Sequence, residues 1–186
     1  MSTSTPAATA VSTWSIDPVH SIAEFRVRHL MISNVRGQFT GVTGSLTYNE
    51  SDLTQSHVDA SIDVATIDTR DPQRDTHLKS PDFFDAEKFP AMTFKSSRVT
   101  RSADGNLVVA GPLSLHGVSK EVEFTVEGPT PPVKDPYGNT RVGVNAKTKI
   151  NRGEFGLTFN APMETGGVMV GEEVSITLEL EFVKKA

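Results

Sequence analysis

The segment VSITLELEF, residues 174–182, alternates apolar and polar side chains without a break. Its even-numbered positions hold Val, Ile, Leu, Leu and Phe, and its odd-numbered positions hold Ser, Thr, Glu and Glu. Successive side chains of a β-strand point to opposite faces, so this period of two predicts a strand with one buried and one solvated face. Nine alternating residues also predict a long strand, because most strands have about five or six residues.

The same alternation recurs in four other segments, at residues 23–29, 58–64, 122–126 and 142–150. Weaker signals predict further strands at 35–48, 92–99 and 107–115, which makes about eight strands in total. Alternating strands with no helical period between them are typical of an antiparallel sandwich or barrel. The length of the runs favours the barrel, and we therefore predict an all-β antiparallel barrel of about eight strands.

One segment, TRDPQRDTHLKSPDFFDAEKFP at residues 69–90, interrupts the alternation. Asp71-Pro72 and Ser80-Pro81 each pair a good helix N-cap with proline at the first helical position. We predict a helical insert of two short helices near residues 70–88. Because the segment contains three phenylalanines, we expect it to cover one open end of the barrel.

The bulk composition is that of one globular domain. The chain has 186 residues, a formal net charge of −5 and no cysteine, which excludes disulfides, thiolate metal sites and a cysteine nucleophile. No basic patch is apparent, so no nucleic-acid partner is expected. We predict a disordered N-terminal lead over residues 1–12 and a single domain over 13–185. The lead lacks the features of a secretory signal, which predicts a cytoplasmic protein, or a periplasmic one if this is a processed form.

The interior of such a barrel is either filled by side chains or hollow. A ten-residue strand spans roughly 33 Å, and at a tilt of ~35–45° it makes a barrel about 25 Å tall. A cavity of that height suits an elongated ligand, and the inward positions are mostly aliphatic and aromatic. Alternation alone does not distinguish such a cavity from a solid core.

Four motifs in order relate the chain to a known family. They are WSIDPVHSIAEFRVRHLMISNVRGQF (14–39), IDVATIDTRDPQRDTHLKSPDFFDAEKFPAMTF (62–94), GPLSLHGVSKEVEF (111–124) and INRGEFGL (150–157). In sequence and spacing they resemble the YceI-like family. The resemblance implies an elongated lipocalin-like barrel that binds a polyisoprenoid, an isoprenoid quinone or a similar long lipid, with no other cofactor required. It also implies a homodimer, and lipid exchange would involve transient contact with a membrane.

We predict that a ligand is contacted by inward-facing apolar residues and by a few polar residues near the mouth of the barrel. The candidate ligand-binding residues are Phe25, Val27, His29, Phe39, Ile62, Arg74, His77, Phe84, Phe94, Val144, Arg152, Phe155 and Phe159. Arg74 and His77 share a helix face and would bind a phosphate or quinone oxygen, or else belong to an Arg–Asp network that holds the insert. Arg152 is expected in an ion pair at the rim or at a lipid head group.

Catalytic and metal-binding patterns are absent from the sequence. There is no HExxH helix and no GxSxG elbow, so we predict neither catalytic nor metal-ligating residues, and no enzyme. Two alternatives remain open, a ligand-free structural or stress-response barrel and a histidine-based, metal-dependent enzyme.

Overall fold

The computed structural model describes residues 11–164 and 166–185, and its regular secondary structure is predominantly β. The strands are β1 (Val11–Ile16), β2 (Ile22–His29), β3 (Ser33–Phe39), β4 (Val42–Asn49), β5 (His57–Asp63), β6 (Ile67–Asp68), β7 (Ala91–Lys95), β8 (Arg98–Arg101), β9 (Leu107–Leu115), β10 (Val118–Glu127), β11 (Val133–Lys134), β12 (Thr140–Asn151) and β13 (Val170–Lys184). The helices are α1 (Pro72–Lys79) and three 3₁₀ turns, η1 (Leu53–Gln55), η2 (Val64–Thr66) and η3 (Arg152–Phe155).

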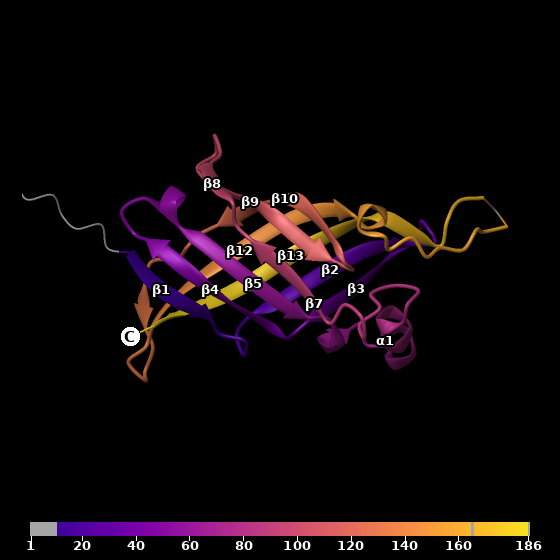
Figure 1. The fold of residues 1–186 in the computed structure, drawn as a ribbon, viewed down its shortest axis with the longest axis horizontal. Helices are drawn as coiled ribbons and strands as arrows, with labels where there is room; N and C mark the ends of the chain where they lie inside the picture. Colours follow the sequence, from indigo (N-terminus) through magenta and orange to yellow (C-terminus); the bar gives the residue numbers. More distant parts are fainter. Residues whose placement is uncertain (1–10, 165, 186) are drawn as a thin grey trace, which may run out of the picture.

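Eight of these strands close into an antiparallel barrel, as predicted. The ring runs β13-β1-β4-β5-β7-β9-β10-β12 and returns to β13 through eleven paired positions with β12. The barrel is elongated, and its strands run obliquely to the long axis (Figure 1). The remaining strands extend this ring. β2 pairs with β13 between Val170 and Glu179 and β3 pairs with β2, whereas β1 pairs with the far end of β13.

Three strand boundaries differ from those predicted. The run 35–48 is two strands, because the strand conformation is interrupted at Thr40-Gly41 between β3 and β4, which continue in the same direction, and the run 92–99 divides into β7 and β8. β1 was not predicted by the alternation, and it begins at Val11, two residues inside the predicted N-terminal lead. Residues 1–10 of that lead lie outside the described residues.

The insert forms one α-helix, and the prediction of a second was wrong. α1 begins as expected, with the Asp71 carboxylate accepting from the backbone N–H groups of Gln73 and Arg74. After Ser80, however, the N–H groups of Phe84, Asp85 and Ala86 donate back to carbonyls of Leu78, Ser80 and Lys79. The chain thus pairs with the end of α1, in turns, and builds no new helix. Figure 1 places α1 at the end of the barrel where the loop between η3 and β13 projects.

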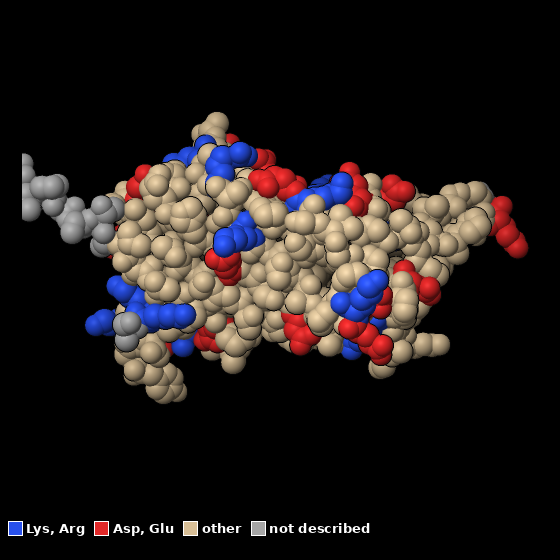
Figure 2. All heavy atoms as spheres, viewed as in Figure 1, with Lys and Arg blue, Asp and Glu red and all other residues tan. Residues whose placement is uncertain are grey.

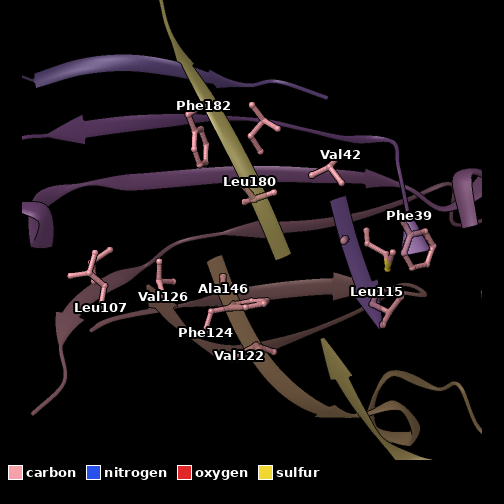
Figure 3. Close-up of a cluster of buried hydrophobic side chains, with 14 of the residues drawn as sticks. Phe39, Val42, Leu107, Leu115, Val122, Phe124, Val126, Ala146, Leu180 and Phe182 are labelled. Atoms are coloured by element: carbon pink, nitrogen blue, oxygen red, sulfur yellow. The ribbon is translucent and has the colours of Figure 1, made fainter. Parts of the chain in front are cut away.

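Inward side chains from opposite walls pack together in the interior. Figure 3 shows Phe39, Leu115, Phe124, Leu180 and Phe182 among those that converge from different strands. Buried Trp14 meets Tyr48 edge-on, with ring centroids 5.7 Å apart. This cluster fills part of the barrel.

A charged cluster joins two connections, β1–β2 and β11–β12, to strands β12 and β13 at the end of the barrel opposite α1. The guanidinium of Arg141 lies 2.6 Å from the carboxylate of Asp17, 2.7 Å from that of Asp135, and in contact with that of Glu181. These interactions hold the pKa of the Asp17 carboxyl far below its ordinary value. Elsewhere, on the face drawn in Figure 2, charges of both signs are interspersed. Among the described residues, no helix is long and apolar enough to cross a membrane.

Candidate functional site

An apolar cavity of about 390 Å³ lies inside the barrel, within the usual range of ~300–1,000 Å³ for ligand pockets. Side chains from nearly every barrel strand line it, together with residues of the insert and of the segment after η3. The interior is therefore neither solid nor an empty tube, because many side chains of the buried cluster themselves line the cavity.

The cavity is long, as its contacts along β13 indicate. Val170, near the α1 end, and Phe182, near the opposite end, both line it, as do four of the apolar positions between them. Twelve residue steps of ~3.3 Å make roughly 40 Å of strand, or about 30 Å along the barrel at a tilt of ~40°. This shape fits an extended chain better than a compact metabolite.

Twelve of the thirteen predicted ligand-binding residues line this cavity. They are Phe25, Val27, His29, Phe39, Ile62, Arg74, His77, Phe84, Phe94, Val144, Arg152 and Phe159. The structure thus brings together residues that are spread over most of the sequence. That these residues contact a ligand stays a prediction.

Phe155, the remaining predicted ligand-binding residue, does not line the cavity. Its side chain is only 1% exposed and belongs to the hydrophobic core. The 3₁₀ turn η3 is capped by the side chain of Asn151 and ends at Gly156 in the left-handed conformation (φ 78°). The Phe155 carbonyl also accepts a hydrogen bond from the His116 ring (3.3 Å). This turn fixes Phe155 in the core, and Phe159, four residues later, reaches the cavity.

Three rings meet at the α1 end of the cavity. The centroid of His77 lies 5.1 Å from that of Phe83 and 5.0 Å from that of Phe159, and the two phenylalanine rings lie 4.9 Å apart. The His77 ring also bonds the Asp82 carboxylate at 2.9 Å. The insert and the segment after η3 therefore contact each other across this end, as expected for a cover. All three ring residues line the cavity.

Arg74 belongs to a network within the insert. Its Nε–H donates to the hydroxyl oxygen of Thr69 (2.8 Å) and its Nη2 to the Thr69 carbonyl (2.8 Å). Asp75 accepts from the backbone and the hydroxyl of Thr69. Asp71 is more distant, with 3.9 Å between the charged groups. Of the two predicted roles, these contacts favour the one that holds the insert in place.

Arg152 has a structural role that the sequence did not reveal. Its side chain is 6% exposed and donates to the backbone carbonyls of Gly171, Leu157, Phe159 and Val170 at 2.5–3.2 Å. The predicted ion pair does not form among the described residues; the guanidinium instead ties η3 and its loop to the start of β13. Burial of the guanidinium, which bonds no carboxylate directly, lowers the pKa of Arg152.

Several other lining residues were not predicted from the sequence. Tyr48 lines the cavity, and burial raises the pKa of its phenol. Leu53 in η1 and Met169 before β13 lie near the two ends of the cavity. Ile176 and Leu178 of β13 were recognisable from the alternation that identified the strand, but the two end residues lie outside any alternating run.

One group of side chains outside the cavity has metal-ligand chemistry. Asp17, His20 and Glu181 place one ligand atom each within 4.8 Å of one another. The Arg141 guanidinium already bonds both carboxylates there, and a cation of the protein therefore occupies the position between them. This geometry favours a structural ion cluster, and the absence of a bound metal stays a prediction.

Solved structures of other proteins share this architecture. BcnA of Burkholderia cenocepacia matches with a TM-score of 0.74 at 22% identity, over 89% of this chain and 98% of that one. The YCEI protein of Campylobacter jejuni matches with 0.72 at 27% identity, over 86% and 90%. A domain from Saccharophagus degradans, described as polyisoprenoid binding and implicated in plant cell wall breakdown, matches with 0.66 at 13% identity, over 95% and 100%.

Sequence comparison identifies closer relatives. The UPF0312 proteins SAB2563 and SA2479, from Staphylococcus aureus strains bovine RF122 / ET3-1 and N315, are 34% and 35% identical over 175 residues. Each match covers 92% of this chain and 98% of the relative. The model of the YceI-like domain matches residues 14–182, which contain all eight strands of the ring except the first residues of β1 and the last of β13. The chain belongs to the YceI-like domain family.

Proposed function

We propose that this protein binds one long apolar lipid inside its barrel and stores or carries it. The observation that supports this most directly is the length and chemistry of the cavity, which is roughly 30 Å long by the strand geometry above and lined mostly by aliphatic and aromatic side chains. Each buried CH₂ group contributes ~0.8 kcal/mol. A chain that fills the cavity therefore binds tightly without a strong polar contact.

An isoprenoid chain, as a polyisoprenoid or the tail of a quinone, is the ligand we propose. The Saccharophagus degradans domain, which shares the fold, is described as binding polyisoprenoids. The His77 ring at the α1 end, with Asp82 bonded to it, offers a polar group to a quinone oxygen or a terminal phosphate. We propose no catalytic step, since the cavity holds no converging acid–base or nucleophile set among the described residues.

The test is to identify what the purified protein contains. Extraction into organic solvent followed by mass spectrometry is expected to yield one long isoprenoid per barrel. A saturated acyl lipid would retain the carrier proposal and refute its isoprenoid part.

An empty extract needs a second measurement, because a carrier can be isolated unloaded. The protein is then titrated with a long-chain isoprenoid quinone and with a compact quinone that lacks the tail. Saturable binding of the first alone supports the proposal. Binding of neither refutes it and favours a ligand-free structural barrel.

A further inference from the structure

The turn between β2 and β3 exposes three consecutive large apolar residues. Leu30 is 36% exposed, Met31 56% and Ile32 79%. Of the large hydrophobic residues that are exposed in the described chain, these three are the only ones adjacent in sequence. The tip of the hairpin is thus an apolar patch that the fold itself does not cover.

The backbone of this turn is unfavourable for the residues that occupy it. Leu30 and Met31 both have positive φ, 50° and 59°, and the Ile32 N–H donates to the His29 carbonyl at 3.0 Å. Two successive residues with positive φ are typical of a type I′ turn, for which Asn-Gly is the favoured sequence. Folding alone therefore does not account for Leu and Met at these positions.

Behind the tip, the outward face of the hairpin is basic. Arg26 of β2 lies directly opposite Arg36 of β3, and Arg28 lies opposite Asn34, one step nearer the tip. All three arginines are exposed, although Arg28 also lines the cavity, and none forms an ion pair among the described residues. Glu24 is on the same face but farther from the tip. Like charges placed opposite each other destabilise a strand pair, so this arrangement also favours an external anionic partner.

The hairpin lies next to the cavity. The Leu30 N–H donates to the carbonyl of Met169 (2.8 Å), and His29 pairs with Val170. His29, Met169 and Val170 all line the cavity. The exposed tip therefore continues directly from the cavity wall at the α1 end.

We propose that the tip Leu30-Met31-Ile32 inserts into the surface of an anionic bilayer and brings this end of the cavity to the membrane, from which the lipid enters. The inference rests on the proposed function. The strand rise of ~3.3 Å per residue puts Arg28 within about 7 Å of the tip and Arg26 and Arg36 about 10–13 Å from it. The head-group layer is roughly 5–8 Å thick on each side of a bilayer. Arg28 then lies among lipid phosphates, and the other two arginines lie just outside them.

Two other arrangements are less consistent with these charges. The neighbouring loop before β13 also projects at this end, but it contains exposed Glu164, which an anionic surface repels. A second copy of the chain, docked symmetrically through the same hairpin, would bring each basic face against its own copy. The bilayer alone matches both the apolar tip and the basic face.

The first experiment measures co-sedimentation with phosphatidylcholine vesicles, with and without added phosphatidylglycerol. The wild-type protein is expected to bind the anionic vesicles. The double variant Leu30→Asn/Met31→Gly is expected to lose on the order of tenfold in partitioning, because it lacks two apolar side chains. The same variant is expected to be at least as resistant to urea as the wild type, because Asn-Gly suits the turn, so misfolding does not explain the loss. The control Val19→Ser, which removes an apolar residue 82% exposed in the β1–β2 turn, is expected to bind normally.

A second variant tests the basic face. Arg26→Gln/Arg36→Gln is expected to weaken binding to anionic vesicles by about fivefold per arginine, with little effect on neutral ones. Equal vesicle binding by the wild type and both double variants would overturn the proposal. A tip variant that binds vesicles normally but no longer forms a dimer would also overturn it, because the tip would then be a contact between two copies of the chain.

Lipid loading separates this proposal from the one on which it rests. A long-chain isoprenoid quinone is offered either in vesicles or diluted from ethanol. The tip variant is expected to load normally from ethanol and several-fold more slowly from anionic vesicles. If no variant loads from either source, the lipid-binding function is refuted, and vesicle sedimentation still decides whether the tip docks.

Discussion

Replacement of Val144 by tryptophan tests whether the cavity holds the ligand. Val144 lies in the middle of β12, opposite Leu180 of β13, and its half-buried side chain lines the cavity. A tryptophan there would occupy space that we assign to the lipid. If it displaces about three CH₂ groups at ~0.8 kcal/mol each, binding weakens by ~2.4 kcal/mol, or roughly 50-fold.

The assay is a titration with a long-chain isoprenoid quinone, combined with urea unfolding of the same samples. Overpacking a filled core costs ~1–3 kcal/mol, whereas filling a cavity need not lower the free energy of unfolding. We therefore expect a variant that is nearly as stable as the wild type and binds about 50-fold more weakly. The matched control is Lys147→Trp, three residues along β12 on the exposed face, where the wild-type lysine lies 3.3 Å from Glu127.

Two results would refute this reasoning. A Val144→Trp protein that unfolds readily would indicate a packed interior at this position. A stable Val144→Trp protein with wild-type affinity would place the ligand elsewhere. Weakened binding in Lys147→Trp as well would indicate a general effect of the added tryptophan.

Three further perturbations test the framework around the cavity. Arg152→Met should lower the free energy of unfolding by about 3–5 kcal/mol in urea, because it leaves buried carbonyls without a donor; a change below 1 kcal/mol would contradict the structural role. The pKa of the Asp17 carboxyl is lower in the folded than in the unfolded state, so its ion pair with Arg141 stabilises the fold above about pH 4 and is lost as the pH falls. Thermal unfolding from pH 7 to pH 2.5 should therefore show a smaller acid-induced decrease in Arg141→Met than in wild type, and parallel curves would refute this. Gly111→Ala should be clearly more destabilising in urea than Gly143→Ala, because a Cβ at Gly111 would lie 2.0 Å from the Lys95 carbonyl, whereas the nearest atom to a Cβ at Gly143 would be 3.7 Å away; equal effects would contradict the close packing of β7 against β9.

Much of the candidate site was predictable because β-strand orientation is a local property. The alternation at 142–150 places Val144 inside, and the run at 23–29 places Phe25 and Val27 inside, whichever strands lie next to them. The Asp71-Pro72 start of α1 was also predictable, since an N-cap involves only its own turn. The family motifs added the expectation of a lipid, which alternation alone does not provide.

The sequence by itself therefore determined the strand-forming runs, their inward faces and the position of the insert. The tertiary structure decided which of those faces enclose a cavity, through the pairing of β12 with β13 that closes the ring. It also decided the role of Arg152, whose guanidinium donates hydrogen bonds to carbonyls five to nineteen residues away in the chain. The same holds for Phe155, whose side chain the η3 turn directs into the core. Such roles depend on partners that only the folded chain brings together, and no local pattern specifies them.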